Sequence, residues 1–274
     1  MKDRKAIVAL KGMIVGGTML VPGVSGGSMA MILGIYGRLV SSVSSFLKDK
    51  KNNFLFLLVF CLGAGVGMIL FANPLLGLIN RYPMPMLYFF MGAVAGGIPL
   101  IYKQAEITSF SWKIPVYIIV GIVLVVLLSK LPTGGFSMEL NGGVDDMIMP
   151  VIAGIIAAVA LILPGISVSY LMLVMGLYDV LMESIGSLYL PFLVPLAVGL
   201  LLGILLTTRI LERAMNQYPQ PTYMIILGFV IGSVGEVFPG VPSLGQMPIC
   251  VITLVAGFAV IYFLSRQEIE KTEE

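Results

Sequence analysis

The chain contains no histidine, and this absence removes several kinds of chemistry. Histidine is the commonest metal ligand and the usual proton shuttle near neutral pH, so a metal centre and a histidine-based phosphohydrolase are disfavoured. Cysteine is nearly absent too. Cys61 and Cys250 lie inside apolar runs, where each is expected to act as a small hydrophobic residue rather than in a disulfide or metal pair. We therefore expect no catalytic residue, no metal and no cofactor, and we do not expect an enzyme.

Charge is also scarce, and this scarcity indicates the solvent of the protein. Charged residues make up 11% of the 274 residues and hydrophobic residues 58%, whereas a soluble domain has about 25% charged residues. Apolar runs approach the roughly 20 residues that cross a bilayer as a helix. We predict an all-α polytopic membrane protein. Six segments are expected to span the membrane: residues 54–72, 86–102, 114–129, 191–208, 223–237 and 248–265.

The chain repeats itself. Pro22-Gly-Val-Ser25 has a counterpart in Pro164-Gly-Ile-Ser167, and 6 of the 18 positions in 22–39 are identical in 164–181. Further on, Tyr82-Pro83 is matched by Tyr218-Pro219. An internal duplication with matching Pro and Gly breaks in an apolar chain is typical of a transporter built from two structural repeats. We predict repeat 1 in residues 1–140 and repeat 2 in residues 141–274.

Each repeat begins with a segment that is broken near its middle. Residues 6–46 and 147–187 each contain an apolar arm, a Pro-Gly break and a second arm. Pro lacks a backbone donor and Gly permits left-handed turns, so a helix ends at such a break. We predict two re-entrant helical hairpins, with second arms at about 27–46 and 170–187. The alternative is a pair of kinked spanning helices.

The positive charges favour the hairpin topology. With re-entrant hairpins and cytoplasmic termini, fourteen of the sixteen Lys and Arg residues face the cytoplasm, and only Arg81 and Lys130 lie outside. Each repeat then has one hairpin and three spanning helices. Because an odd number of spanning helices ends the first repeat on the opposite side of the membrane, the second repeat starts there and is inverted relative to the first.

The two hairpin tips are the candidate binding site. A non-helical turn at membrane depth is tolerated only where protein or a water-filled cavity surrounds it, so the tips are expected to face each other. Backbone N–H groups at the start of a helix, together with hydroxyl donors, suit an anion such as phosphate. The second tip is poorer, since Val168 and Tyr170 replace Gly26 and Ser28. The candidates for binding a phosphate head are Ser25, Gly26, Gly27, Ser28, Ser167 and Ser169.

Three cations could complete this site. Arg38 and Lys11 are flanked by apolar sequence in the first hairpin, and an ionisable residue within a membrane segment indicates function. Arg suits bidentate phosphate capture better than Lys. The alternative for both is snorkelling to the cytoplasmic interface. Arg81 is a candidate first contact for anions arriving outside, or a surface anchor.

Four further residues are weaker candidates for entry or gating. Tyr36 and Tyr178 occupy matching positions in the two repeats, although packing at the membrane interface is the favoured explanation for both. Asp179 and Glu183 follow the second break and could form a proton or cation site. Their alternative is a pair of solvated loop acids.

The motifs resemble a known family. The segments Val21–Ser28, Gly34–Leu39 and Leu163–Ser167 are similar to those of the polyprenyl-phosphate transporters of bacteria, and the resemblance covers nearly the whole chain. It implies a bacterial plasma-membrane protein that moves undecaprenyl phosphate, the lipid carrier of cell-wall precursors, from the outer to the inner leaflet for reuse. Three positions depart from the family pattern: Met19 and Gly37, where many members carry an acid, and Val168, where many carry Gly.

We compared four functions. The first is a flippase that binds the phosphate head at the paired tips, with membrane lipids as the other partner and a homodimer as a possible assembly. The second is a secondary transporter of a small soluble anion. An intramembrane phosphatase or lipid transferase lacks a supporting constellation, and a structural scaffold leaves the broken helices unexplained. No feature indicates nucleic-acid binding.

Overall fold

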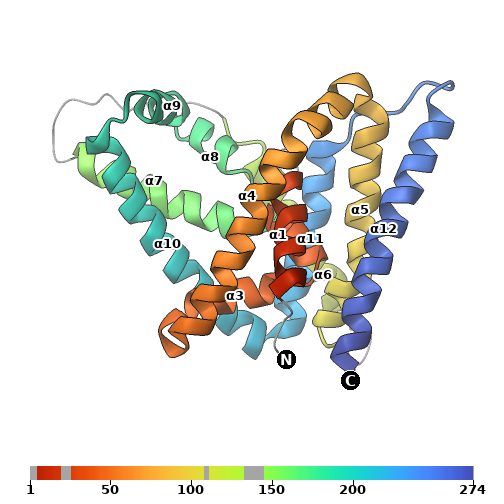
Figure 1. Ribbon diagram of the computed structural model, residues 1–274, viewed down its shortest axis with the longest axis horizontal. Coiled ribbons are helices and arrows are strands. Elements are labelled where there is room, and N and C mark those ends of the chain that lie inside the picture. Colours follow the sequence, from red (N-terminus) through yellow and green to blue (C-terminus); the bar gives the residue numbers. More distant parts are fainter. Residues whose placement is uncertain (1–4, 20–25, 108–110, 133–144, 274) are drawn as a thin grey trace.

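Glycine and proline divide the apolar chain into helices of very different length. The computed structural model describes residues 5–19, 26–107, 111–132 and 145–273, and these contain helices and connecting turns with no strand (Figure 1). The all-α prediction is therefore confirmed for the described residues. In the first half the helices are α1 (Lys5–Thr18), α2 (Gly26–Ile32), α3 (Tyr36–Ser44), a 3-10 turn η1 (Phe46–Lys48), α4 (Lys50–Arg81), α5 (Pro83–Gln104) and α6 (Lys113–Leu128). In the second half they are α7 (Asp145–Ile162), α8 (Val168–Val174), α9 (Tyr178–Ser187), α10 (Leu190–Gln217), α11 (Pro219–Val237) and α12 (Met247–Glu273).

The two halves have the same order of helices, and their equivalent turns have the same backbone conformation. Gly34 and Gly176 both have φ of +68°. Tyr82 and Tyr218, which separate the fourth and fifth helices of each half, both have φ −134° and ψ 61°. The sequence duplication is thus a duplication of local structure. The inverted relation of the two repeats remains a prediction.

The second arm of each hairpin is not one continuous helix, and this part of the prediction is wrong. The expected arm 27–46 is divided into α2 and α3 at Gly34, and the arm 170–187 into α8 and α9 at Gly176, with a bend of 111° between α8 and α9. At Gly34 the N–H groups of Gly34 and Ile35 bond to the carbonyls of Met31 and Ala30. This is the glycine-terminated Schellman ending of a helix, and a residue at positive φ cannot continue an α-helix.

Among the described residues, four helices are long and apolar enough to cross a membrane: α4, α5, α10 and residues 247–266 of α12. They contain four of the six expected spans. The expected spans 114–129 and 223–237 coincide with α6, which has 16 residues, and α11, which has 19. Membrane crossing by α6 and α11 remains a prediction. At 32 residues α4 is about 48 Å long, more than the roughly 30 Å of a bilayer core.

Helices pack in pairs, some within one half and some between halves. Within the halves, α1 packs on α4 and α7 on α10. Between the halves, α5 packs on α12 and α6 on α11, so that α5 and α12 lie side by side in Figure 1. Glycines make these close approaches possible. A Cβ added at Gly16 would lie 2.1 Å from the carbonyl oxygen of Ala64, and one at Gly199 would lie 2.0 Å from that of Val151.

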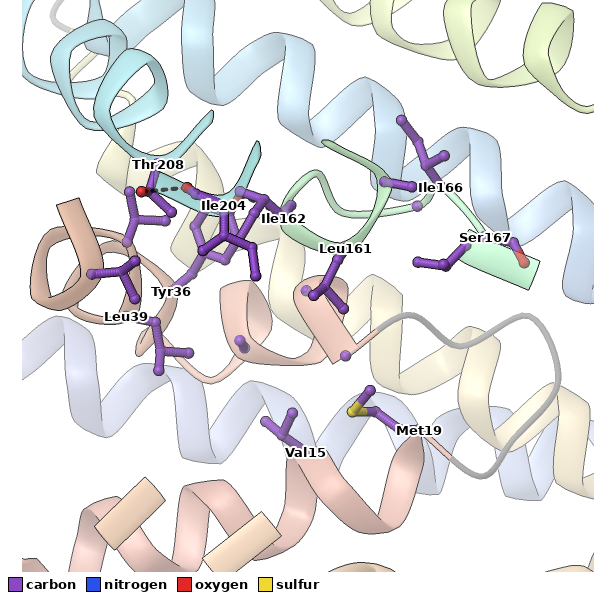
Figure 2. A pocket seen from close by; sticks show the side chains of 18 of the residues that line it. Val15, Met19, Tyr36, Leu39, Leu161, Ile162, Ile166, Ser167, Ile204 and Thr208 are labelled. Atoms are coloured by element: carbon purple, nitrogen blue, oxygen red, sulfur yellow. Dashed lines mark hydrogen bonds between the residues drawn. The ribbon is translucent and has the colours of Figure 1, made fainter. Parts of the chain in front are cut away.

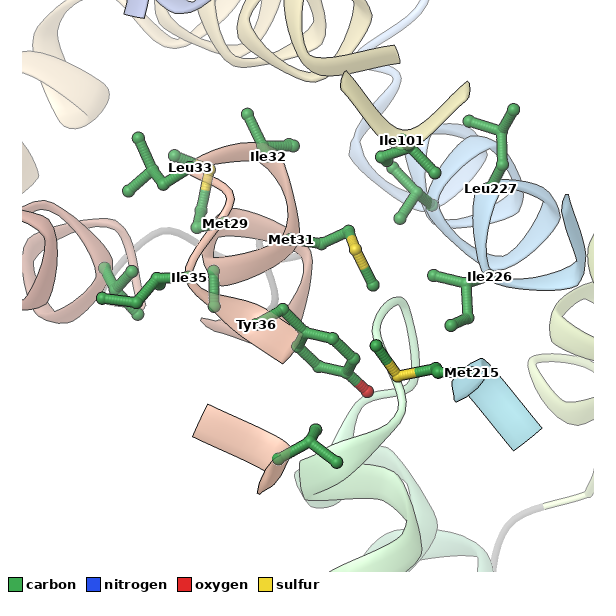
Figure 3. Close-up of a cluster of buried hydrophobic side chains, with 14 of the residues drawn as sticks. Met29, Met31, Ile32, Leu33, Ile35, Tyr36, Ile101, Met215, Ile226 and Leu227 are labelled. Atoms are coloured by element: carbon green, nitrogen blue, oxygen red, sulfur yellow. The ribbon is translucent and has the colours of Figure 1, made fainter. Parts of the chain in front are cut away.

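The main core is centred on the short helix α2. Its Met29, Met31 and Ile32 are almost fully buried. They belong to a cluster that includes Ile101 of α5 and Ile226 of α11 (Figure 3). Helix α2 is therefore held in place by helices from both halves.

Candidate functional site

A cavity of about 700 Å³ lies between the two halves (Figure 2). Its lining comes from α1, α2, α3 and α4 of the first half and from α7, α8 and α10 of the second. The lining is largely apolar, with side chains that include Val15, Met19, Leu39, Val40, Val43, Phe60, Leu161, Ile166 and Ile204. No charged side chain is among the described residues that line it.

The structure brings both predicted hairpin tips to this cavity. Gly26 and Gly27, at the start of α2, line it together with residues 165–169, which lead into α8. Gly165 has φ of +82°, and a Cβ there would lie 2.4 Å from the carbonyl oxygen of Phe229. The second tip is thus pressed against α11. Ser25 lies outside the described residues.

Two serines of the second tip present hydroxyl groups to the cavity. Ser167 and Ser169 are exposed and line it, and Figure 2 shows the hydroxyl of Ser167 at its edge. Ser167 is the N-cap of α8, where its Oγ accepts a hydrogen bond from the N–H of Tyr170 at 3.2 Å. The Tyr170 hydroxyl contacts the carbonyl oxygens of Ser129 at 2.9 Å and Leu131 at 2.7 Å, which fastens α8 to the end of α6.

Ser28 is not placed as expected. It is buried, it is not among the residues that line the cavity, and its Oγ has no hydrogen-bond partner among the described residues. The sequence shows that Ser28 follows two glycines, but the helix that begins there turns the side chain into the core.

The three predicted cations lie away from the cavity. Arg38 is exposed on α3, with its guanidinium carbon 5.3 Å from the centre of the Phe56 ring on α4. Lys11 is half-buried on α1. Arg81 is exposed at the end of α4, 5.5 Å from the ring of Tyr82. None of the three lines the cavity.

The two repeat-matched tyrosines have different surroundings. Tyr36 is buried and lines the cavity, and its hydroxyl donates to the carbonyl oxygen of Ile162 at 2.7 Å. Tyr178 is half-buried against the smaller core of the second half and does not line the cavity. Asp179 and Glu183 are exposed on α9, also away from it.

Two residues that the sequence interpretation missed are next to the site. Thr208 of α10 is fully buried and lines the cavity, and its hydroxyl donates to the carbonyl oxygen of Ile204 at 2.7 Å (Figure 2). Glu212 follows one turn later and accepts hydrogen bonds from Ser44 and from Ser45, the latter at 3.3 Å. The spacing of four residues puts Thr208 and Glu212 on one face of α10. This polar pair in an apolar helix was the sequence pattern that could have identified them.

The chemistry of this cavity suits an amphiphile better than a hydrophilic ion. Hydroxyls and backbone amides at the two tips can donate to an anionic group, whereas most of the wall can only contact hydrocarbon. In the part of the chain that the structure describes, no group of three or more Cys, Asp or Glu side chains could hold a metal ion.

Comparisons with known proteins find relatives that match most of the chain. A family described as undecaprenyl phosphate translocase-like matches residues 15–247. A relative from Staphylococcus aureus, named polyprenyl-phosphate transporter, is 32% identical over 97% of this chain and 98% of its own length. A relative of the same name from Vibrio cholerae is 29% identical over 84% of this chain and 76% of its own length. No solved structure matches the chain. The resemblance inferred from the repeated motifs is thereby confirmed.

Proposed function

Because this chain belongs to the undecaprenyl phosphate translocase-like family, we propose that it moves undecaprenyl phosphate from the outer to the inner leaflet of the bacterial plasma membrane. The relatives named polyprenyl-phosphate transporter support the substrate class. The direction of transport and the reuse of the lipid in cell-wall synthesis are part of the proposal. The physical task is to shield an anionic head group, whose unaided transfer into hydrocarbon is costly.

One observation carries the assignment of the binding site: the two duplicated tips line the same cavity. In the proposal the phosphate accepts hydrogen bonds from the backbone of Gly26 and Gly27 and from the hydroxyls of Ser167 and Ser169. The isoprenoid chain follows the apolar wall and continues into the lipid between the two halves. This wall favours a lipid over a small soluble anion, which would find few partners on it.

In this proposal the three cations contact the phosphate head at the two ends of its route across the membrane. Arg38 lies on the outer surface of α3 beside α4, where it can receive the head group as the lipid leaves the cavity. We assign Lys11 of the first arm the same role. Arg81, at the opposite end of α4, attracts the head group from the other leaflet.

The proposed topology has both termini in the cytoplasm. The start of α1 and the end of α12 point toward the same end of the molecule (Figure 1), as this topology requires. That end also holds α3, so α3 faces the cytoplasm and α9 the outside.

The test is binding of undecaprenyl phosphate to the purified protein, with the uncharged polyprenol as the control ligand. A side chain at Gly27 would occupy the space next to the first tip, so Gly27→Val is expected to weaken phosphate-lipid binding at least tenfold. The matched variant is Gly65→Val, since a Cβ there has no atom within 4 Å, and it is expected to bind normally. Normal binding by Gly27→Val, or equal binding of the polyprenol, would contradict head-group recognition at the tips.

A further inference from the structure

The two halves make unequal contacts across the cavity. Helix α3 of the first half packs along α10 of the second, where a Cβ at Gly37 would lie 3.5 Å from the methyl carbon of Met215. Its repeat counterpart α9 packs on α10 of its own half, and packing of comparable extent between α9 and α4 does not occur among the described residues. In Figure 1, α4 and α10 diverge toward the end of the molecule where α8 and α9 lie. Among the described helices, α3 thus bridges the two halves at one end of the cavity, and α9 does not form a comparable bridge at the other.

The bridged end carries a polar contact between the halves. Ser44 and Ser45, at the end of α3, both donate their hydroxyls to the carboxylate of Glu212 on α10. Hydrogen bonds to a carboxylate are stronger than those between neutral groups. Glu212 is half-buried, so it can exchange these donors for water when the helices separate.

The repeated sequence gives this contact no counterpart in the other half. By the repeat offsets of 136 and 142 residues, Glu212 corresponds to Leu76, and Ser44 and Ser45 correspond to Gly186 and Ser187. The side chain of leucine has no atom that can accept a hydrogen bond from a serine hydroxyl. The difference between the two ends is therefore written into the sequence as well as the structure.

The contact also lies directly beyond the cavity wall. Val43 of α3 and Thr208 of α10 both line the cavity. Ser44 directly follows Val43 in the chain, and Glu212 lies one helical turn after Thr208. Separation of Ser44 from Glu212 would open the space between α3 and α10 to that end of the molecule. Closure of repeats against each other around a fixed site is the usual way in which repeat-built transporters alternate access.

We propose that Glu212, held by Ser44 and Ser45, is the gating contact that closes the α3 end of the cavity, and that it breaks when the protein opens toward that end. The assignment of this end to the cytoplasm rests on the proposed function. The opposite state brings α9 toward α4. Because the sequence has a leucine, and no carboxylate, at the position that corresponds to Glu212, the protein rests in the state closed at α3, with the cavity available to substrate from the other leaflet.

Cross-linking tests whether the contact must open. Ser44→Cys and Glu212→Cys are combined after Cys61→Ser and Cys250→Ala, and the pair is bridged with a short thiol reagent that reductant cleaves. A reagent is used because cysteine is shorter than glutamate and a direct disulfide needs closely spaced backbones. In vesicles that contain undecaprenyl phosphate, bridging is expected to lower transport at least tenfold, and reductant is expected to restore it.

The reduced double variant is its own control for folding and for transport. If the reduced variant and the bridged protein transport undecaprenyl phosphate at the same rate, the contact between Ser44 and Glu212 is not a gate, and the proposed transport function is unaffected. If the wild-type protein moves no undecaprenyl phosphate, the proposed function fails instead. If the reagent does not bridge positions 44 and 212, the two helices are not adjacent in the membrane and the proposal is overturned.

A distance measurement tests the gate without transport. Spin labels at Leu47 and Asn216 report the α3 end, and labels at Leu70 and Ser187 report the other end; all four positions are exposed. Glu212→Leu is expected to lengthen the first distance and shorten the second. Glu212→Gln keeps an acceptor oxygen and is expected to leave both distances near wild type. Unchanged distances in Glu212→Leu, or changes of the same sign at both ends, would overturn the proposal.

Discussion

At the scale of residues, Tyr36 shows how one side chain joins the two breaks. The last carbonyl groups of an α-helix have no partner within the helix, and Ile162 ends α7 just before the second Pro-Gly break. The Tyr36 hydroxyl, from the start of α3, satisfies this carbonyl at 2.7 Å. The tyrosine therefore couples α3 to the end of α7, in addition to lining the cavity.

Tyr36→Phe is expected to destabilise the folded protein by about 1–3 kcal/mol, because the carbonyl of Ile162 loses its donor in a partly buried site. The measurement is denaturant-induced unfolding in detergent. Tyr102→Phe is the matched control, since Tyr102 is exposed on α5, and it should change the stability by less than about 0.5 kcal/mol. An equal effect of both variants would contradict the coupling role of Tyr36.

The serines of the two tips have different roles at this scale. Ser167 caps α8, whereas the buried Oγ of Ser28 has no partner among the described residues. Ser167→Ala is expected to cost about 0.5–2 kcal/mol of stability through the lost cap. Ser28→Ala is expected to be neutral or stabilising, because it removes an unpaired polar atom from an apolar core. Thermal unfolding of the two variants side by side checks this order, and a larger loss for Ser28→Ala would reverse it.

At the scale of elements, the long helices are held together by close backbone contact. Gly16 of α1 lies against Ala64 of α4, and Gly67 of α4 lies against Met13 of α1. Apolar association does not drive helices together in lipid, so van der Waals packing at small residues has to do so. The same arrangement recurs between α7 and α10 at Gly154 and Gly199.

Gly16→Leu is expected to separate α1 from α4, because the added Cβ would lie 2.1 Å from a backbone oxygen that cannot yield as a flexible side chain does. Overpacking of this kind costs about 1–3 kcal/mol or more. Gly65→Leu is the matched control, since it lies on the same helix pair and faces open space. The yield of monodisperse protein after detergent extraction should fall for Gly16→Leu alone. Equal yields would mean that the α1–α4 contact tolerates separation.

At the scale of the whole molecule, the two repeats are interlocked rather than merely adjacent. The fifth helix of each half packs on the last helix of the other, as α5 does on α12 and α11 on α6. The predicted repeats, 1–140 and 141–274, are therefore units of sequence whose helices complete each other. In the proposed gating, α3 moves relative to the second half while these helix pairs hold the two halves together.

The topology is a property of the whole molecule, and it is tested by labelling single cysteines in intact cells. A cysteine at position 49 should react only with a reagent that reaches the cytoplasm, and one at position 145 should react from the outside. The physical reason is that this topology puts fourteen of the sixteen Lys and Arg residues on the cytoplasmic side, as the positive-inside rule favours. Labelling of position 49 from the outside alone would exclude cytoplasmic termini with two re-entrant hairpins.

The sequence by itself indicated the membrane class, the family and one Pro-Gly break in each half. Pro lacks a backbone donor and Gly permits left-handed turns, so such a break can be recognised from the local sequence alone. The extra break that divides each second arm was missed because a single glycine in an apolar run is a weaker signal than Pro-Gly. Only the tertiary structure decided which groups meet. Arg38 faces Phe56 instead of the cavity, Ser28 turns into the core, and Glu212 reaches Ser44 across 168 residues of chain. Such contacts depend on the close packing of helices distant in sequence, which no local pattern specifies.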